Sequence, residues 1–158
     1  MFRYMFLFLS LPIAAQSVKV YKKNKIDSGV ITSEGWLFDG VKSDYWYTYN
    51  TDQNIYSEGH FKVGLKEKYW YFYQPNKKIL KEGHYRNGLM CGWWVFYDKT
   101  GSIACKKQYD KDKKQGFCVL YAHGEVFKIE KYRNDIKVGE WTDLKSFELE
   151  NELNELLK

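Results

Sequence analysis

Residues 58–81 read EGHFKVGLKEKYWYFYQPNKKILK and residues 82–105 read EGHYRNGLMCGWWVFYDKTGSIAC. The second stretch repeats the first: the tripeptide Glu-Gly-His recurs 24 residues later, and Trp70 recurs as Trp94. A fixed period in this range is typical of repeat arrays, in which each unit packs against its neighbours. This repeat therefore decides the fold.

The same frame extends in both directions from the central pair of units. Upstream it meets Glu34-Gly35 and Trp46. Downstream the motif decays, because Lys106-Lys107 stand at the Glu-Gly positions and Cys118 stands at the tryptophan position. We therefore expect one repeat array over residues 34–144, containing about four and a half units.

Each unit is predicted to form a β-hairpin. The stretch 69–73 is entirely aromatic, which favours a strand over a helix. Asn87-Gly88 is the strongest short signal for a two-residue hairpin turn. A tight turn at Lys99-Thr100, which would pair Asp98 with Gly101, is expected between the next two strands. The sequence thus predicts an all-β fold, a single-layer antiparallel meander of stacked hairpins.

The N-terminal segment, residues 1–16, has the layout of a signal peptide. Arg3 precedes an apolar run from Met5 to Ile13, and the small residues Ala14-Ala15 follow. An uncleaved anchor or a buried terminal strand is the alternative interpretation. We expect cleavage after Ala15 or Gln16, which would place the mature protein in the periplasm or outside the cell.

The two ends of the mature chain are expected to cap the array. Residues 17–33 are predicted to form an irregular N-terminal cap. Residues 145–158 carry leucines at helical spacing, and Ser146 or Asp143 can cap the start of the predicted helix. This C-terminal helix is expected to cover the last hairpin and its open edge. Docking on a partner is the alternative role for the helix.

The alternation of side chains along a strand assigns the aromatic residues to two faces. One face carries a row of tryptophans, Trp46, Trp70, Trp94 and Trp141. The other face is rich in tyrosine, a residue that favours interfaces. The candidate binding residues on that face are Tyr45, Tyr47, Tyr49, Tyr69, Tyr71, Tyr73, Trp93 and Tyr97. Simple packing of these rings across the strands is the alternative.

The charge distribution argues against a nucleic-acid partner. The formal net charge is +5, and basic and acidic residues are interspersed. A nucleic-acid-binding protein concentrates its positive charge on one face. A protein partner is expected instead, a membrane surface remains open, and the sequence does not decide the oligomeric state.

No catalytic or metal-binding motif stands out, so the sequence predicts a protein that is not an enzyme, without cofactor or metal. Counting back from the Asn87-Gly88 turn places His84 opposite Cys91, a pairing that could make a thiolate site. The glutamates Glu34, Glu58 and Glu82 share a face and are expected to form hydrogen bonds within the repeat.

Counting outward from a turn at Lys111-Asp112 places Cys105 opposite Cys118. Directly opposed residues on antiparallel strands are close enough for a disulfide after a small local adjustment. Export would place the chain where disulfides persist. The sequence therefore predicts a disulfide between Cys105 and Cys118, and three reduced cysteines are the alternative.

The motif Glu-Gly-x-(Phe/Tyr)-x-x-Gly, followed by x-Trp-x-x-Tyr and an isoleucine, resembles the MORN-repeat variant, found in bacterial chains often labelled YwqK-type antitoxins. The resemblance covers residues 34–144. It implies a meandering sheet of hairpins that binds proteins or membranes and does not catalyse reactions. Because a cytoplasmic antitoxin would not be exported, we do not transfer that label.

Four functions are therefore considered from the sequence. The first is an exported, non-enzymatic scaffold that binds a protein through the tyrosine-rich face. The second is a structural component of the cell envelope that self-associates. The third is a toxin-neutralising, antitoxin-like protein, and the fourth is an enzyme that uses Cys91 and His84.

Overall fold

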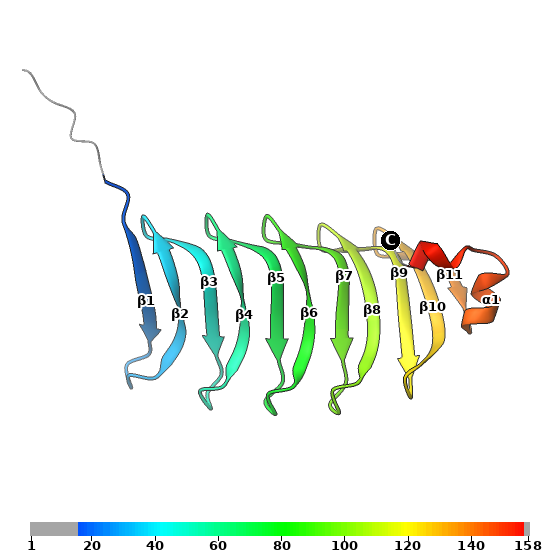
Figure 1. The fold of residues 1–158 in the computed structure, drawn as a ribbon, viewed down its shortest axis with the longest axis horizontal. Coiled ribbons are helices and arrows are strands. Elements are labelled where there is room, and N and C mark those ends of the chain that lie inside the picture. The colour runs from blue at the N-terminus through cyan, green and yellow to red at the C-terminus, as the bar shows by residue number, and fades with distance from the viewer. Residues whose placement is uncertain (1–15, 157–158) are drawn as a thin grey trace, which may run out of the picture.

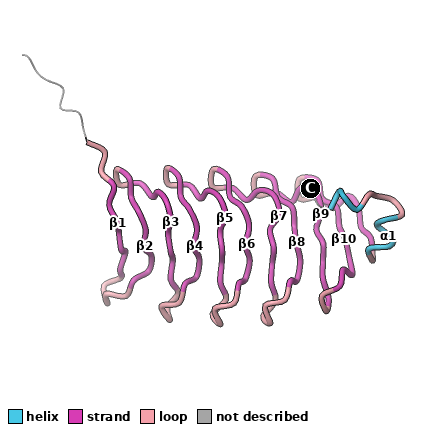
Figure 2. Tube along the Cα trace, in the orientation of Figure 1, coloured by secondary structure: helices cyan, strands magenta, loops and turns pink. Residues whose placement is uncertain are grey.

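The computed structural model describes residues 16–156, so residues 1–15 of the predicted signal peptide lie outside the described part of the chain. Eleven antiparallel strands form one sheet in which the spatial order equals the chain order (Figure 1). The strands form a single layer, with two short helical segments at its C-terminal end (Figure 2). The predicted all-β meander of hairpins is confirmed.

The bounds of the elements follow the sequence repeat. The strands are β1 (Lys19–Lys25), β2 (Ile31–Phe38), β3 (Val41–Tyr49), β4 (Ile55–Lys62), β5 (Leu65–Tyr73), β6 (Ile79–Arg86), β7 (Leu89–Tyr97), β8 (Ile103–Asp110), β9 (Lys113–Ala122), β10 (Glu125–Arg133) and β11 (Ile136–Trp141), followed by helix α1 (Leu144–Glu148) and the 3-10 helix η1 (Leu153–Leu156).

The turns at the two ends of the strands differ, and each end forms one long edge of the sheet. At one edge, two-residue turns such as Asn87-Gly88 have positive φ at both positions, as a type I′ turn requires. At the other edge the first four hairpins have longer loops, and the tight turn predicted at Lys99-Thr100 is wrong. The loop spans residues 98–102 because the Asp98 carboxylate accepts hydrogen bonds from the backbone N–H groups of Thr100 at 2.8 Å and Ser102 at 3.0 Å.

The core of the sheet depends on tryptophan rings that lie on glycines of the neighbouring strand. Gly83 pairs directly with Trp94, and a Cβ added at Gly83 would lie 2.4 Å from the indole ring. The Trp94 Nε1 donates a hydrogen bond to the His84 carbonyl at 3.1 Å. The same arrangement occurs twice more, at Gly35–Trp46 and Gly59–Trp70. These tryptophans, with Phe72, form the buried row of one face, called here the Trp face.

A second core lies at the C-terminal end, on the opposite face. Phe117, Val119 and Ile129 are buried beneath Phe147 of α1, which is fully buried. Trp141 packs edge-on against Phe147, with ring centroids 5.1 Å apart. The prediction that Trp141 lies on the Trp face is therefore wrong: the 23-residue step that reaches it crosses register shifts in β10 and β11, which change the alternation.

The two predicted caps differ in part from expectation. Residues 17–33 are not irregular, because β1 pairs along its length with β2 and extends the sheet. The C-terminal segment is not one helix: α1 has five residues, a turn follows, and η1 completes the segment. Asp143 caps α1, and its carboxylate accepts a hydrogen bond from the Ser146 N–H at 2.6 Å. Neither helical segment of the described chain is long and apolar enough to cross a membrane.

The predicted register of the cysteines is wrong. The turn at Lys111-Asp112 is as expected, but a bulge in β9 then shifts the pairing, so that Cys105 lies opposite Leu120 and Cys118 lies opposite Lys107. Cys105 and Cys118 are thus diagonal neighbours, which on a sheet lie about 7–8 Å apart. That separation exceeds ordinary disulfide geometry. All three cysteines are free thiols.

The contact between Trp94 and Gly83 gives a double-mutant test. Trp94→Ala is expected to lower the free energy of unfolding by about 3–5 kcal/mol, because it empties a buried site. Gly83→Ala is expected to lower it by about 1–3 kcal/mol, because the new methyl group overlaps the ring. Denaturant unfolding followed by circular dichroism measures both changes.

In the double variant the ring is absent, so Gly83→Ala should add little further loss. Fully additive losses would show that the two residues do not interlock. Trp36→Ala is the control, since Trp36 is 37% exposed and its removal should cost much less.

Candidate binding face

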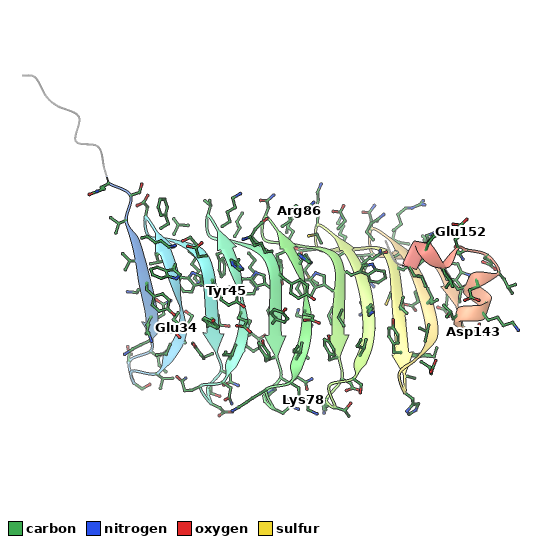
Figure 3. The ribbon with its side chains drawn as sticks, in the orientation of Figure 1. Glu34, Tyr45, Lys78, Arg86, Asp143 and Glu152 are labelled. Carbon is green, nitrogen blue, oxygen red and sulfur yellow. The ribbon has the colours of Figure 1, made fainter. Side chains whose placement is uncertain are left out.

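The tyrosine-rich face is built on one row of directly paired residues that crosses the sheet. From β2 to β6 the row alternates carboxylate and phenol: Glu34, Tyr47, Glu58, Tyr71, Glu82. Directly paired residues project to the same side, so this row and its neighbours form one surface, called here the Tyr face. Figure 3 labels Glu34 on β2 and Tyr45 on β3.

Each glutamate of the row accepts a hydrogen bond from a tyrosine of the next strand. The Tyr49 hydroxyl donates to Glu34 Oε1 at 2.5 Å, and the Tyr97 hydroxyl donates to Glu82 Oε1 at 2.5 Å. Tyr73 donates to Glu58 in the same way. The expectation that these three glutamates form hydrogen bonds within the repeat is confirmed.

The other aromatic residues of the Tyr face pack against one another along the strands. The ring centroids of Tyr45 and Tyr47 are 5.2 Å apart, and Tyr69 and Tyr71 repeat this pair at 5.1 Å. His60 packs edge-on against Tyr45 at 4.9 Å. These contacts stabilise the sheet, while the rings stay partly exposed.

The structure brings the predicted candidates together, with one distinction. The seven tyrosines, Tyr45, Tyr47, Tyr49, Tyr69, Tyr71, Tyr73 and Tyr97, are all half-buried on the strands β3, β5 and β7. Trp93 instead packs against the C-terminal core. Trp93 therefore marks the place where the open part of the Tyr face ends.

The C-terminal segment of the chain closes the remainder of the Tyr face. Leu153 and Leu156 of η1, together with Trp93, Val95 and Val119, line an apolar groove of about 510 Å³. The leucine spacing in the tail indicated an apolar helix surface, but no pattern in the sequence indicated which face of the sheet it covers. Sequence reasoning therefore missed this groove.

Ion pairing is uneven along the carboxylate row. Lys23 of β1 lies directly opposite Glu34, and its Nζ is 2.9 Å from Glu34 Oε2. Within residues 16–156, no lysine or arginine forms an ion pair with Glu58 or Glu82. The open Tyr face therefore carries two carboxylates without cationic partners.

The predicted pairing of His84 with Cys91 is confirmed. Burial raises the pKa of the Cys91 thiol, and the nearby Arg86 opposes this rise only in part. A reactive cysteine needs a lowered pKa, so this pair lacks the electrostatic feature of a thiolate nucleophile. Among residues 16–156, no group of three or more His, Cys, Asp or Glu side chains is placed to hold a metal ion.

Comparisons of the chain with protein-family models and with curated proteins find no match.

The tyrosine hydroxyls make the fold sensitive to alkali. Burial and the negative charge of Glu82 raise the pKa of Tyr69 to about 12, and burial raises the pKa of Tyr85 to about 12. The pKa of an unfolded tyrosine is about 10, so these groups favour the folded state fully below about pH 10. Stability should therefore fall as the pH rises from about 10 towards 12.

The titration can be followed by tyrosinate absorbance, and stability by denaturant unfolding at each pH. Tyr69→Phe is the matched variant, because it removes the ionising hydroxyl and keeps the ring. It should lose less stability than the wild type over the same pH range. A denaturant midpoint that stays constant up to about pH 12 would contradict the shifted pKa values.

Proposed function

We propose that this protein is an exported, non-catalytic scaffold that binds a protein partner through the open part of its Tyr face. The observation that carries the proposal is the regular row of tyrosines and carboxylates from Glu34 to Glu82, partly exposed on a single-layer sheet. Tyrosine rings held rigidly by neighbours offer contact area and hydrogen bonds at low entropic cost. The resemblance to the MORN-repeat variant agrees with a binding role.

The residue at which the sheet begins agrees with removal of the N-terminal segment. The strand β1 starts at Lys19, after the expected cleavage site at Ala15 or Gln16. Cleavage there would leave every strand of the sheet intact. The signal-peptide layout of residues 1–16 supplies the argument for export.

Self-association through the sheet edge is less well supported. The strand β1 is an edge strand, and four of its seven residues are lysines. Lysines on an edge strand discourage pairing with a second copy. No specific observation favours toxin neutralisation.

The binding role can be tested by site-specific photo-crosslinking. A photoreactive phenylalanine analogue at Tyr71 should form adducts with a protein partner in the native compartment. The same analogue at Tyr56 is the control, because Tyr56 is exposed and packs against Phe72 on the Trp face. Adducts at Tyr56 but not at Tyr71 would show that the partner binds elsewhere.

Substitution then measures the contribution of the face. With the captured partner purified, Tyr47→Ser together with Tyr71→Ser should weaken binding at least about tenfold, because aromatic residues dominate interface energetics. Tyr56→Ser should leave the affinity unchanged. A folded double variant that binds like the wild type would refute the assignment of the face.

Export is tested by the mass of the mature protein. Protein isolated from the envelope or the medium should lack the first 15 or 16 residues, as cleavage after Ala15 or Gln16 requires. Leu7→Arg, which interrupts the apolar run, should leave the full-length chain inside the cell. Full-length wild-type protein in the cytoplasm would contradict export and leave the binding role to be judged by the crosslinking result.

A further inference from the structure

The three glutamates of the Tyr face occupy equivalent positions in successive repeats, but only the first has a cationic partner. Glu34 Oε1 accepts the hydroxyl of Tyr49, and Glu34 Oε2 lies 2.9 Å from the ammonium group of Lys23. One period later, Tyr47 occupies the position of Lys23 and lies opposite Glu58. The ammonium group is therefore missing from this unit.

The carboxylate oxygen that meets Lys23 in the first unit has no ion pair in the next two units of the described chain. Tyrosine hydroxyls take Oε1 of Glu58 and of Glu82. No side chain of the described residues forms an ion pair with either carboxylate, and neither second oxygen is fully buried without a partner. Each carboxylate, itself half-buried, therefore keeps one oxygen without a cationic partner among the described residues.

The surroundings of these oxygens suit a cationic group. The Tyr45–Tyr47 pair flanks Glu58, and the Tyr69–Tyr71 pair flanks Glu82. Carboxylates form strong charge-assisted hydrogen bonds with ammonium and guanidinium groups, and aromatic rings add a cation–π attraction. Lys23 on Glu34 shows that a lysine side chain fits this setting. The two carboxylates without cationic partners disfavour anionic partners, such as nucleic acids and anionic lipids, at these positions.

The spacing of the carboxylates defines the partner further. Glu58 on β4 and Glu82 on β6 are separated by two strand spacings, about 10 Å. Three residues of a polyproline II segment, which has three residues per turn and a rise of about 3.1 Å per residue, span about the same distance and return the side chain to the same side. A segment in this extended polyproline II conformation, running across the strands, can therefore place basic side chains three residues apart on both carboxylates.

The row changes character beyond Glu82. Val95 and then Lys106 follow in the same row, and both line the apolar groove that contains Trp93 and Leu156. Lys106 repels a third basic residue there, whereas the groove accepts an apolar one. The face thus has a direction: it accepts basic side chains on β4 to β6 and an apolar side chain beside β8.

We infer that the Tyr face binds an extended basic segment of a protein partner, with the pattern basic-x-x-basic-x-x-apolar. The two basic side chains bind Glu58 and Glu82, and the apolar side chain enters the groove beside Lys106. This inference rests on the proposed binding function and adds the chemical class of the partner.

Selection from a displayed random-peptide library on the complete mature protein tests the inference. The enriched peptides should carry two lysines or arginines three residues apart. A synthetic peptide of that pattern should bind at least about tenfold more weakly to the variant Glu58→Gln/Glu82→Gln, which keeps the acceptors for Tyr73 and Tyr97 but loses the charges. Glu125→Gln/Glu148→Gln is the control, since it makes the same charge change at exposed sites and should bind like the wild type.

A gain of recognition supplies the second arm. Lys23→Ser should release Glu34, so that selection on this variant extends the pattern to three basic residues at three-residue spacing. The inference is overturned if enriched peptides lack paired basic residues, if nothing is enriched, or if the Glu58 and Glu82 variant binds like the control variant. Crosslinking at Tyr71 that persists in any of those cases would leave the binding function intact, whereas its absence would remove that function as well.

Discussion

The structure depends on the contact between an indole ring and a glycine backbone. A single-layer sheet has no second layer under which to bury its side chains, so it needs another way to exclude water. Here Trp70 lies flat against Gly59 of the adjacent strand, where a Cβ would overlap the ring. The ring is 1% exposed although only one sheet is present. Repetition of this contact fixes the spacing and the register of the hairpins.

The two faces of the sheet consequently have opposite electrostatic character. On the Trp face, lysines lie over the rings, and the Lys66 Nζ is 4.5 Å from the centroid of Trp70. Burial lowers the pKa of Lys66, and the neighbouring positive charges of Lys81 and Lys42 contribute. On the Tyr face, the carboxylates lie among phenols. The thin sheet therefore separates cationic and anionic surfaces by one strand thickness.

The fourth repeat shows what happens when the contact is lost. Lys107 stands at the glycine position, Cys118 stands at the tryptophan position, and the two lie directly opposite each other. A lysine side chain leaves no flat backbone surface for an indole, so both partners change together. The buried core then moves to the other face, where Phe117 and Phe147 meet. That shift explains why the C-terminal segment covers only this end.

Much of the fold could be predicted because the repeat carries it. The period gave the meander, and the Asn87-Gly88 turn gave the pairing of His84 with Cys91. The carboxylate row followed from the same alternation. The predictions for Cys105 and Trp141 failed for one physical reason: a bulge adds residues to one strand only, and each such insertion changes the pairing or the face beyond it.

The face of the sheet that the C-terminal segment covers could not be predicted from the sequence either. Helical periodicity shows that Leu153 and Leu156 share a surface, but it does not say which side of the sheet that surface meets. Because the strands carry aromatic residues on both faces of the sheet, composition does not distinguish the two sides. Only the bulges decide which side is apolar at β9 and β10.

The strands pair only with their neighbours in the chain, which makes length an independent property of this molecule. Gain or loss of one 24-residue unit by gene duplication would leave each remaining hairpin with the same kind of neighbour. Each added unit would lengthen the sheet by about 10 Å. Evolution can therefore change the length of the binding surface in steps of one repeat without redesigning the core.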